Sequence, residues 1–321
     1  MLVTRDLQEP LIALPTVLTF GVYDGLHLGH QLIMRTVVER AGLLSLPATV
    51  LTFDPHPRAV LHPESAPALL QTFEQKMESM RALGISQVIV LPFTNALSQM
   101  PAETFLKEIV FGRLDAREVY LGRGFAFGHN RAGRFELLKQ VGDHLQRVAK
   151  EVPEVNLRGH RVSSTMVRRL LSAGRVNLAR RMLGRPYEVD GRVIEGRKVG
   201  KAALGYGTAN LKPINYVIPA PGVYVTLTRW GDRSQQSITN VGHRPTFGGD
   251  PDISVETHIF NFDNEMYGQK ISVQFLHRVR GEIKFESVDA LRRQIDLDSK
   301  LAAAYFQKSS KCKFAQLSGE K

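Results

Sequence analysis

The chain has 321 residues, of which 43% are hydrophobic and 23% are charged, and it carries a formal net charge of +11. This length suggests two domains, and the composition excludes a disordered, collagen-like or coiled-coil chain. The single cysteine, Cys312, excludes an internal disulfide and every cysteine-rich zinc site, and the absence of a transmembrane stretch or signal peptide predicts a cytoplasmic protein with no membrane partner.

The first half of the sequence alternates strand-like and helix-like runs. Strands are predicted at 17–20, 48–53, 88–91, 119–121 and 146–152, and helices at 30–42, 73–83, 101–110 and 134–140. This βαβα order predicts an α/β domain, with a parallel sheet that has helices on both faces. Ligands of such sheets bind at the carboxyl ends of the strands.

The second half has a different character. Helices are predicted at 163–173 and 177–183, and Gly184 and Pro186 then mark a domain boundary near residue 185. Beyond it, Gly, Pro and Asn separate short β-branched and aromatic runs, which predicts a small antiparallel barrel. Its strands are expected at 223–227, 237–239, 253–260 and 271–275, followed by a helix at 287–306 and a frayed tail at 308–321.

The positive charge is concentrated in one segment. Residues 113–185 contain 14 Arg and 2 Lys against 6 acidic residues, whereas residues 1–112 have a net charge of −3. Arginine presents a planar fork of donors that suits phosphate groups. A partner that carries phosphate is therefore predicted, either a nucleic acid or a nucleotide.

The strongest local signal is the segment GVYDGLHLGH at 21–30, between a predicted strand and a predicted helix. Free N–H groups at a helix N-terminus favour phosphate, and the imidazoles of His27 and His30 would donate to phosphoryl oxygens. The alternative is a glycine-rich turn with two unrelated surface histidines. A zinc site is disfavoured because no third ligand has suitable spacing. The candidate ligand-binding residues of this segment are Gly21, Asp24, Gly25 and Gly29.

Three further motifs follow in order. TFDPHP at 52–57 is either a loop at the same sheet edge or a plain rigid turn. In GRGFAFG at 122–128, Phe125 and Phe127 would either flank a flat ring or belong to the core. VSSTMVR at 162–168 is either a phosphate cradle completed by Arg168 or a helix cap without a ligand. The cradle would use Ser163, Ser164 and Thr165, with Arg161 and Arg169 as further candidates.

Together these four motifs resemble those of the bacterial bifunctional riboflavin kinase/FMN adenylyltransferase (FAD synthetase) family. The resemblance covers roughly residues 15–305. It implies an N-terminal Rossmann-like nucleotidyltransferase domain at 1–185. It also implies a C-terminal riboflavin kinase-like antiparallel barrel with a final helix at 186–321.

The second half carries landmarks that resemble the kinase of this family. The segment 196–211 is similar to its glycine loop, whose amides hold ATP phosphates, and the resemblance implies that Thr208 and Asn210 bind Mg²⁺. Glu256 matches the general base for the ribityl hydroxyl, although by itself it reads as a carboxylate on a solvated strand. The other implied nucleotide- and flavin-binding residues are Gly200, Gly205, Tyr224 and Asn240.

The resemblance implies a two-step enzyme with ATP, riboflavin and FMN as substrates and FAD as final product. His27, His30 and Arg168 would stabilise charge during adenylyl transfer, which needs no protein nucleophile. Two departures from the family pattern leave open that only one activity is retained. Gly207 replaces a proline of the kinase loop, and Gly124 stands where the family carries Asp or Asn.

Other readings remain at this point. The first domain by itself permits a nucleotidyltransferase for another phosphate acceptor. The basic segment permits a non-catalytic RNA-binding protein, but no RRM, KH or zinc-finger signature is present, which disfavours nucleic acid. The sequence leaves the formation of a homo-oligomer open.

Overall fold

The computed structural model describes residues 1–5, 7, 15–195, 208–244, 252–262 and 264–317. It divides into two compact units, residues 1–164 and 165–321. No helix in these described ranges is both long and apolar enough to cross a membrane. The division lies at the beginning of the helices predicted at 163–183, which were expected to belong to the first domain.

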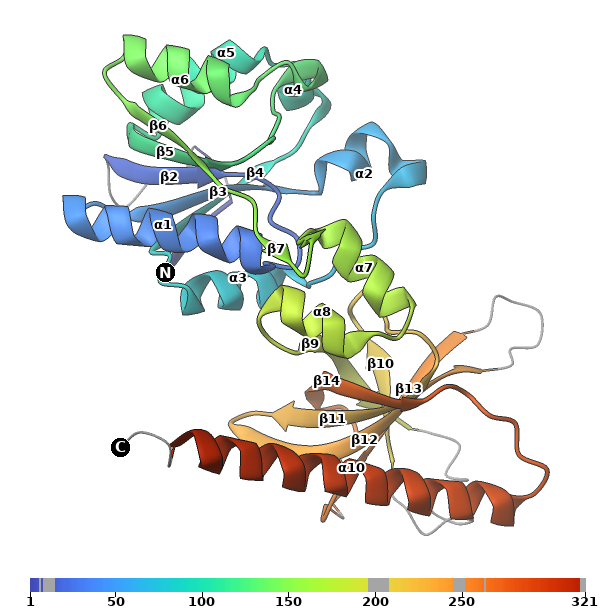
Figure 1. Ribbon diagram of the computed structural model, residues 1–321. Coiled ribbons are helices and arrows are strands. Elements are labelled where there is room, and N and C mark those ends of the chain that lie inside the picture. Colours follow the sequence, from blue (N-terminus) through green and yellow to red (C-terminus); the bar gives the residue numbers. More distant parts are fainter. Residues whose placement is uncertain (6, 8–14, 196–207, 245–251, 263, 318–321) are drawn as a thin grey trace. The chain divides into compact units, whose positions relative to one another are not determined.

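A six-stranded parallel sheet forms the first unit, which confirms the predicted α/β fold (Figure 1). Its strand order is β1-β4-β3-β2-β5-β6. Five strands match the prediction, and β1 is an addition that pairs with β4 at the edge. The bounds are Leu2–Thr4 (β1), Thr16–Phe20 (β2), Ala48–Asp54 (β3), Gln87–Pro92 (β4), Ala116–Gly122 (β5) and Val148–Val152 (β6).

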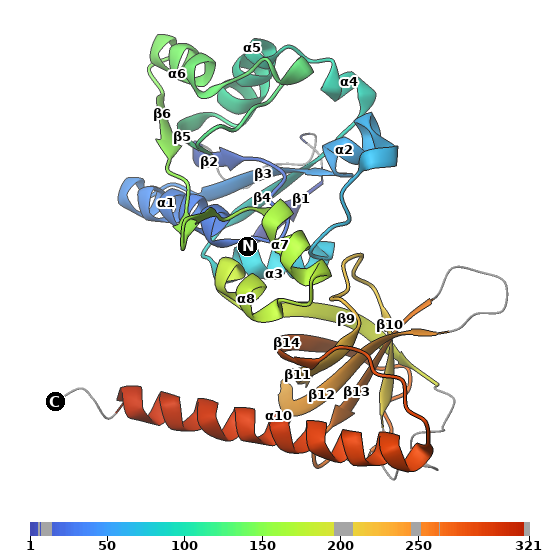
Figure 2. The same ribbon diagram turned by 45° about the vertical axis from the view of Figure 1, so that its right-hand side comes forward.

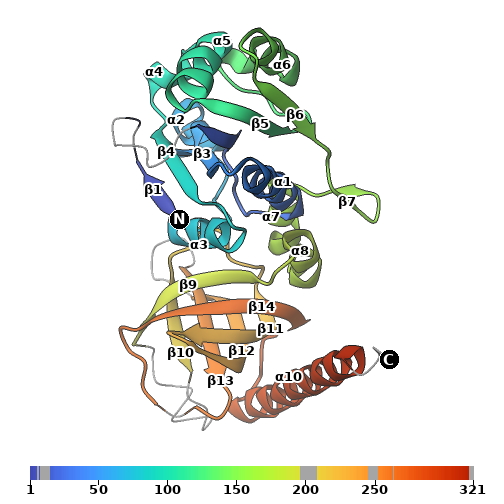
Figure 3. The ribbon, with the colours of Figure 1, turned by 90° about the vertical axis from the view of Figure 1, so that its left-hand side faces the viewer.

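Helices cover both faces of this sheet (Figure 3). On one face α1 (Leu28–Leu44) and α3 (Phe73–Ala82) pack on Val17 and Val50. On the other, a π-helical segment η2 (Phe105–Arg113) and α6 (Phe135–His144) enclose Leu18 and Phe20. Short elements complete the unit: α2 (Pro57–Leu61), η1 (Pro63–Ser65), α4 (Asn95–Ser98), α5 (Ala102–Thr104), η3 (His129–Arg131), β7 (Asn156–Leu157) and β8 (His160–Arg161).

Helix α1 is longer than predicted at both ends. Gly42 does not end it, because the left-handed conformation that terminates the helix is taken by Ser45, at φ 54°. The Ser45 N–H donates to the carbonyls of Ala41 and Gly42. At the other end the helix begins beside His27, so both predicted histidines belong to its first turn or its cap.

The second unit is a closed antiparallel barrel, as predicted, preceded by α7 (Ser164–Ser172) and α8 (Val176–Leu183). The Ala220 N–H donates to the Leu171 carbonyl, which fixes α7 to the barrel. The strand order of the barrel is β10-β13-β12-β11-β14-β9. The bounds are Tyr187–Ile194 (β9), Ala209–Pro213 (β10), Gly222–Trp230 (β11), Arg233–Arg244 (β12), Asp252–Ile259 (β13) and Lys270–Arg280 (β14).

Helix α10 (Val288–Leu317) lies along the outside of the barrel (Figure 2). Ala302 and Phe306 pack on Val223 and Ile238. The prediction of a frayed tail from residue 308 was wrong as far as Leu317, since the helix continues there without a proline or glycine. Nearer its beginning, the carboxylate of Asp298 accepts a two-pronged hydrogen bond from Arg280, at 2.8–3.2 Å, and joins α10 to β14.

Replacing Asp298 with alanine should loosen α10 from the barrel. The Asp298 side chain is 3% exposed and that of Arg280 is 17% exposed, and breaking a buried ion pair from one side costs up to about 3–5 kcal/mol. The free energy of unfolding can be followed by urea titration of Trp230 fluorescence, because the only tryptophan of the sequence lies on β11. The exposed Lys300→Ala on the same helix is the control and should change stability by less than about 0.5 kcal/mol. Equal stability of the two variants would contradict the expectation.

Candidate functional site

Three predicted motifs meet at the carboxyl edge of the first sheet. Strand β2 pairs in parallel with β3 on one side and β5 on the other, in the registers Phe20↔Leu51 and Leu18↔Val119. The loops that follow these strands therefore leave the sheet side by side. This is also where the chain order of the strands reverses, the place at which open α/β sheets bind ligands.

His27 and His30 stack on each other at the N-terminus of α1. Their ring centroids lie 3.7 Å apart with an interplanar angle of 22°. The His27 ring nitrogen Nδ1 accepts a hydrogen bond from the His30 backbone N–H at 3.4 Å and so caps the helix. Because Nδ1 is the acceptor, the proton of a neutral His27 ring lies on Nε2, which makes Nε2 a donor at the positive end of the helix dipole.

The environment of His30 holds its ring in the neutral form. Burial is the main cause that lowers the pKa of His30 well below 6.5, and the nearby charges of His27 and Lys76 lower it further. The ring packs edge-on against Tyr23 at 5.2 Å between centroids. Its buried Nδ1 has no hydrogen-bond partner among the described residues. A polar atom enclosed in this way is suited to a ligand that supplies the missing partner.

Asp24 connects three segments around the histidines. Its carboxylate accepts from the Leu70 N–H at 2.9 and 3.2 Å, and its backbone carbonyl accepts from the Ser164 hydroxyl at 2.9 Å. Gly25 follows at φ +82°, where a Cβ would lie 2.6 Å from the Leu70 side chain. Asp24 and Ser164, both predicted to bind a ligand, thus hold the loop in place through these hydrogen bonds. Gly21 and Gly29 lie directly against Tyr23 and His27.

Sequence reasoning missed Lys76, which lies one turn into α3. Its ammonium Nζ donates to the Val22 carbonyl at 3.2 Å and to the Thr52 hydroxyl at 3.4 Å. Lys76 thus reaches the loop after β2 and the end of β3 together. A signal existed in the sequence, because a cation near a helix N-terminus opposes the helix dipole.

The aromatic loop after β5 belongs largely to the core. Phe127 is buried and Phe125 is half-buried, and both pack edge-on against Phe20, at 5.2 and 5.7 Å between centroids. For Phe127 the structure supports the core reading that the sequence left open, and ring contact by Phe125 stays a prediction. Gly124 adopts φ +71° with open space around it, a conformation that Asp and Asn also tolerate. Gly124 in place of Asp or Asn is therefore compatible with the same backbone conformation of the loop.

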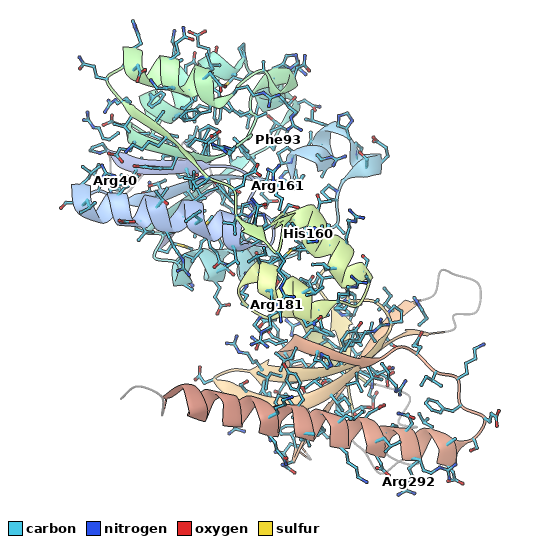
Figure 4. The ribbon with its side chains drawn as sticks, in the orientation of Figure 1. Arg40, Phe93, His160, Arg161, Arg181 and Arg292 are labelled. Carbon is cyan, nitrogen blue, oxygen red and sulfur yellow. The ribbon has the colours of Figure 1, made fainter. Side chains whose placement is uncertain are left out.

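Most of the 14 arginines in residues 113–185 form ion pairs with nearby carboxylates or are exposed. Arg161 pairs with Glu154 at 3.0 Å and Arg123 pairs with Glu151 at 3.1 Å, while Arg147 pairs with Asp115 at 2.7 Å. Arg181 on α8 is an exposed arginine of this segment, and Arg292 on α10 is an exposed arginine outside it (Figure 4). Arg168 and Thr165 lie on α7 in the second unit, and their roles stay predictions.

In the barrel, three predicted residues form one row across neighbouring strands. Glu256 on β13 is paired directly with Asn210 on β10 and with Asn240 on β12. Directly paired residues share a face, and because the neighbouring Thr257 points into the barrel, the row lies on the outside. Thr208, directly before β10, is exposed.

Tyr224 is enclosed by the barrel, whereas a side chain that contacts a ligand was expected to be accessible. Its side chain is fully buried inside the barrel, packs edge-on against Phe275 and donates from its hydroxyl to the Ala220 carbonyl. It supports the barrel wall from within, and its assignment as a binding residue stays a prediction. Gly200, Gly205 and the Gly207 departure lie outside the described residues.

The side chains in this row and at Thr208 beside it offer hard oxygen atoms as metal ligands. The Thr208 hydroxyl and the Asn210 carbonyl suit Mg²⁺ that is bound mainly through phosphates. Within the described part of the chain, no group of three or more His, Cys, Asp or Glu side chains forms a metal site. The residues present therefore fit a metal brought with a nucleotide better than a metal held by a cage of protein ligands.

Comparison with known proteins gives two adjoining family matches. Residues 10–166 match the FAD synthetase model and residues 183–306 match the riboflavin kinase model. Bifunctional riboflavin kinase/FMN adenylyltransferases are similar over most of their length. The one from Haemophilus influenzae is 34% identical over 90% of this chain and 94% of its own, and the one from Pseudomonas fluorescens is 35% identical over 90% and 92%.

A solved structure also resembles the whole chain. The crystal structure described as a macrolide-efflux protein from Streptococcus pneumoniae has a TM-score of 0.86 and 27% identity, over 94% of this chain and 98% of that one. The name of that protein describes efflux, whereas both family models and the curated relatives name flavin-nucleotide enzymes.

The buried, neutral His30 should make the first unit sensitive to mild acid. Its folded pKa lies below the unfolded value of about 6.5, so its stabilising contribution is present above pH 6.5 and is lost as pH falls below it. The urea midpoint, followed by far-UV circular dichroism, should therefore fall between pH 7 and 5 by less in His30→Gln than in the parent chain. The exposed His144→Gln is the control and should follow the parent. An unchanged slope in His30→Gln would show that His30 titrates normally.

Proposed function

The chain belongs to the bifunctional riboflavin kinase/FMN adenylyltransferase family, and from this premise we propose how it phosphorylates riboflavin to FMN and then joins FMN to AMP from a second ATP. The observation that carries the two-step function is the pair of adjoining family matches on one chain. We assign adenylyl transfer to residues 1–185 and riboflavin phosphorylation to residues 186–321. We also place the enzyme in the cytoplasm, where Cys312 would stay reduced.

In adenylyl transfer, a phosphate oxygen of FMN attacks the α-phosphorus of ATP. A new P–O bond forms, the bond to the β-phosphate breaks, and pyrophosphate leaves. The nucleophile is already ionised at neutral pH, so positioning and charge stabilisation suffice. His27 Nε2 and the His30 ring would donate to the phosphoryl oxygens, supported by the positive end of α1. Arg168 and Thr165 would bind phosphate, because residues 162–168 resemble the phosphate-binding motif of the family.

In riboflavin phosphorylation, the ribityl hydroxyl loses its proton and its oxygen attacks the γ-phosphorus of ATP. A new P–O bond forms, the bond to the β-phosphate breaks, and ADP leaves. Glu256 would take that proton, and the register that places it between Asn210 and Asn240 supports this role. Thr208 and Asn210 would hold Mg²⁺, which when bound screens the charge of the ATP phosphates. Asn240 would bind substrate from the same face of the barrel.

The alternative functions lose support against these observations. A nucleotidyltransferase for another acceptor would not need a riboflavin kinase barrel, and this barrel matches its family model over residues 183–306. A non-catalytic RNA-binding protein would need neither enzyme domain, whereas residues 10–166 and 183–306 match the two family models.

The direct experiment is a product assay on the full chain. With riboflavin, Mg²⁺ and ATP, we expect FMN and then FAD, resolved by chromatography. Accumulation of FMN without FAD would locate a defect in the first site, near Gly124. Conversion of supplied FMN to FAD without phosphorylation of riboflavin would locate it in the kinase site, near Gly207. Absence of both products would refute the proposed division of function.

Variants in each site should separate the two reactions. His30→Ala should lower FAD formation from supplied FMN by about 10²–10³-fold, the range for losing a donor to developing charge, and leave FMN formation intact. Glu256→Ala should lower FMN formation from riboflavin and leave FAD formation from supplied FMN intact. Each variant is thus the control for the other, measured by initial rates. Equal loss of both reactions in either variant would argue against separate sites.

A further inference from the structure

A half-buried lysine lies among the histidine loops without a role in the steps proposed above. Lys76 is the fourth residue of α3, a helix whose N-terminus is closed by a capping box between Thr72 and Gln75. A cation at this position gains nothing from the helix, because the N-terminal end of the dipole is positive. The reason for a lysine here must come from what its ammonium group reaches.

The ammonium group of Lys76 contacts the loop after β2 and the carboxyl end of β3. Nζ donates to the Val22 carbonyl at 3.2 Å and to the Thr52 hydroxyl at 3.4 Å, and Thr52 itself donates to the same carbonyl at 3.1 Å. Both acceptors of Lys76 are neutral. A neutral donor would join these two loops as well, so the hydrogen bonds do not account for a full positive charge.

The charge itself costs free energy in this position. Burial is the main cause that lowers the pKa of Lys76, and the carboxylates of Asp24 and Asp54 act against this and favour the charged form. The same ammonium charge acts on His30, one of the proposed catalytic residues. An ammonium group has three donors, and two of them have acceptors in this structure. The third N–H of Lys76 is available to a ligand at the carboxyl edge of the sheet. The buried Nδ1 of His30, which has no partner among the described residues, lies at the same edge.

We propose that Lys76 is a phosphate-binding residue of the adenylyl-transfer site, whose third N–H donates to a phosphoryl oxygen of ATP or of FMN. The inference rests on the proposed function of residues 1–185. A compact ammonium can bind phosphate as a point charge while it stays bound to the loops. Lys76 would then couple the position of the loops after β2 and β3 to the arrival of phosphate.

The test compares Lys76→Gln with Lys76→Arg in the full chain. Both substitutions keep a side-chain donor for Val22 and Thr52, but only arginine keeps the charge. FAD formation is measured from supplied FMN with ATP, so that the kinase step is bypassed, and kcat and KM are determined for each substrate. FMN formation from riboflavin by the same preparation is the internal control for enzyme concentration, and far-UV circular dichroism during urea unfolding is the control for folding of the first unit. Lys139→Gln, an exposed lysine on α6 paired with Asp143, is the matched control for loss of one charge.

We expect Lys76→Gln to lower kcat/KM for FAD formation by about 10- to 100-fold, as for loss of a hydrogen bond to a charged group. Lys76→Arg should retain most of the activity, and Lys139→Gln should match the parent chain. A rise in KM for ATP would assign the contact to the nucleotide, and a rise in KM for FMN would assign it to the flavin phosphate.

Two results would overturn the inference. Parent-like kinetics of Lys76→Gln would show that the charge binds nothing, and equal losses in the glutamine and arginine variants would show a role in loop packing only. Failure of the parent chain to form FAD from supplied FMN would instead refute the proposed function itself.

Discussion

The first unit depends on the parallel pairing of β2 with both β3 and β5. This pairing is fixed by strands that are buried on both faces, with Leu18 and Phe20 on one side and Val17 on the other. A parallel sheet places the ends of its strands on one edge whatever the lengths of the connections. Loops separated by up to a hundred residues in sequence therefore adjoin, and Asp24 and Lys76 hold them there by hydrogen bonds to Leu70, Val22 and other neighbours.

In the barrel, strand register brings residues that are distant in sequence next to one another. Glu256, Asn210 and Asn240 are distant in sequence and become neighbours because antiparallel pairing aligns one residue from each strand. The opposite face of these strands is closed by hydroxyl groups that bond to one another, such as Thr226 to Thr239 at 2.8 Å. A polar interior of this kind is satisfied within itself, so it needs no partner from the row on the outer face.

The same hydroxyl interior explains where sequence reasoning was incomplete. The central strands β2, β3 and β4 of the first sheet are largely apolar runs and were predicted closely. Strand β12 instead carries Ser237 and Thr239 inside the barrel, so hydrophobic alternation marked only part of it. The end of α1 was missed because a serine took the left-handed position expected of glycine. The histidine motif was predictable because its residues are contiguous. The contacts of Asp24 with Leu70 and of Lys76 with Thr52 depend on tertiary structure, and no local pattern encodes them.

Net charge pointed to phosphate binding in residues 113–185, and the proposed site also draws on residues outside that segment. The arginine-rich segment 113–185 joins several of its arginines to carboxylates, as Arg147 does with Asp115. The histidine pair and Lys76 lie instead in residues 1–112, where acidic residues outnumber basic ones. A phosphate site needs few charges if they are partly withdrawn from water, since each then acts in a lower dielectric than a surface arginine does. With the proposed role of Lys76, the position of a cation relative to buried loops is a better guide to such a site than the number of cations in a segment.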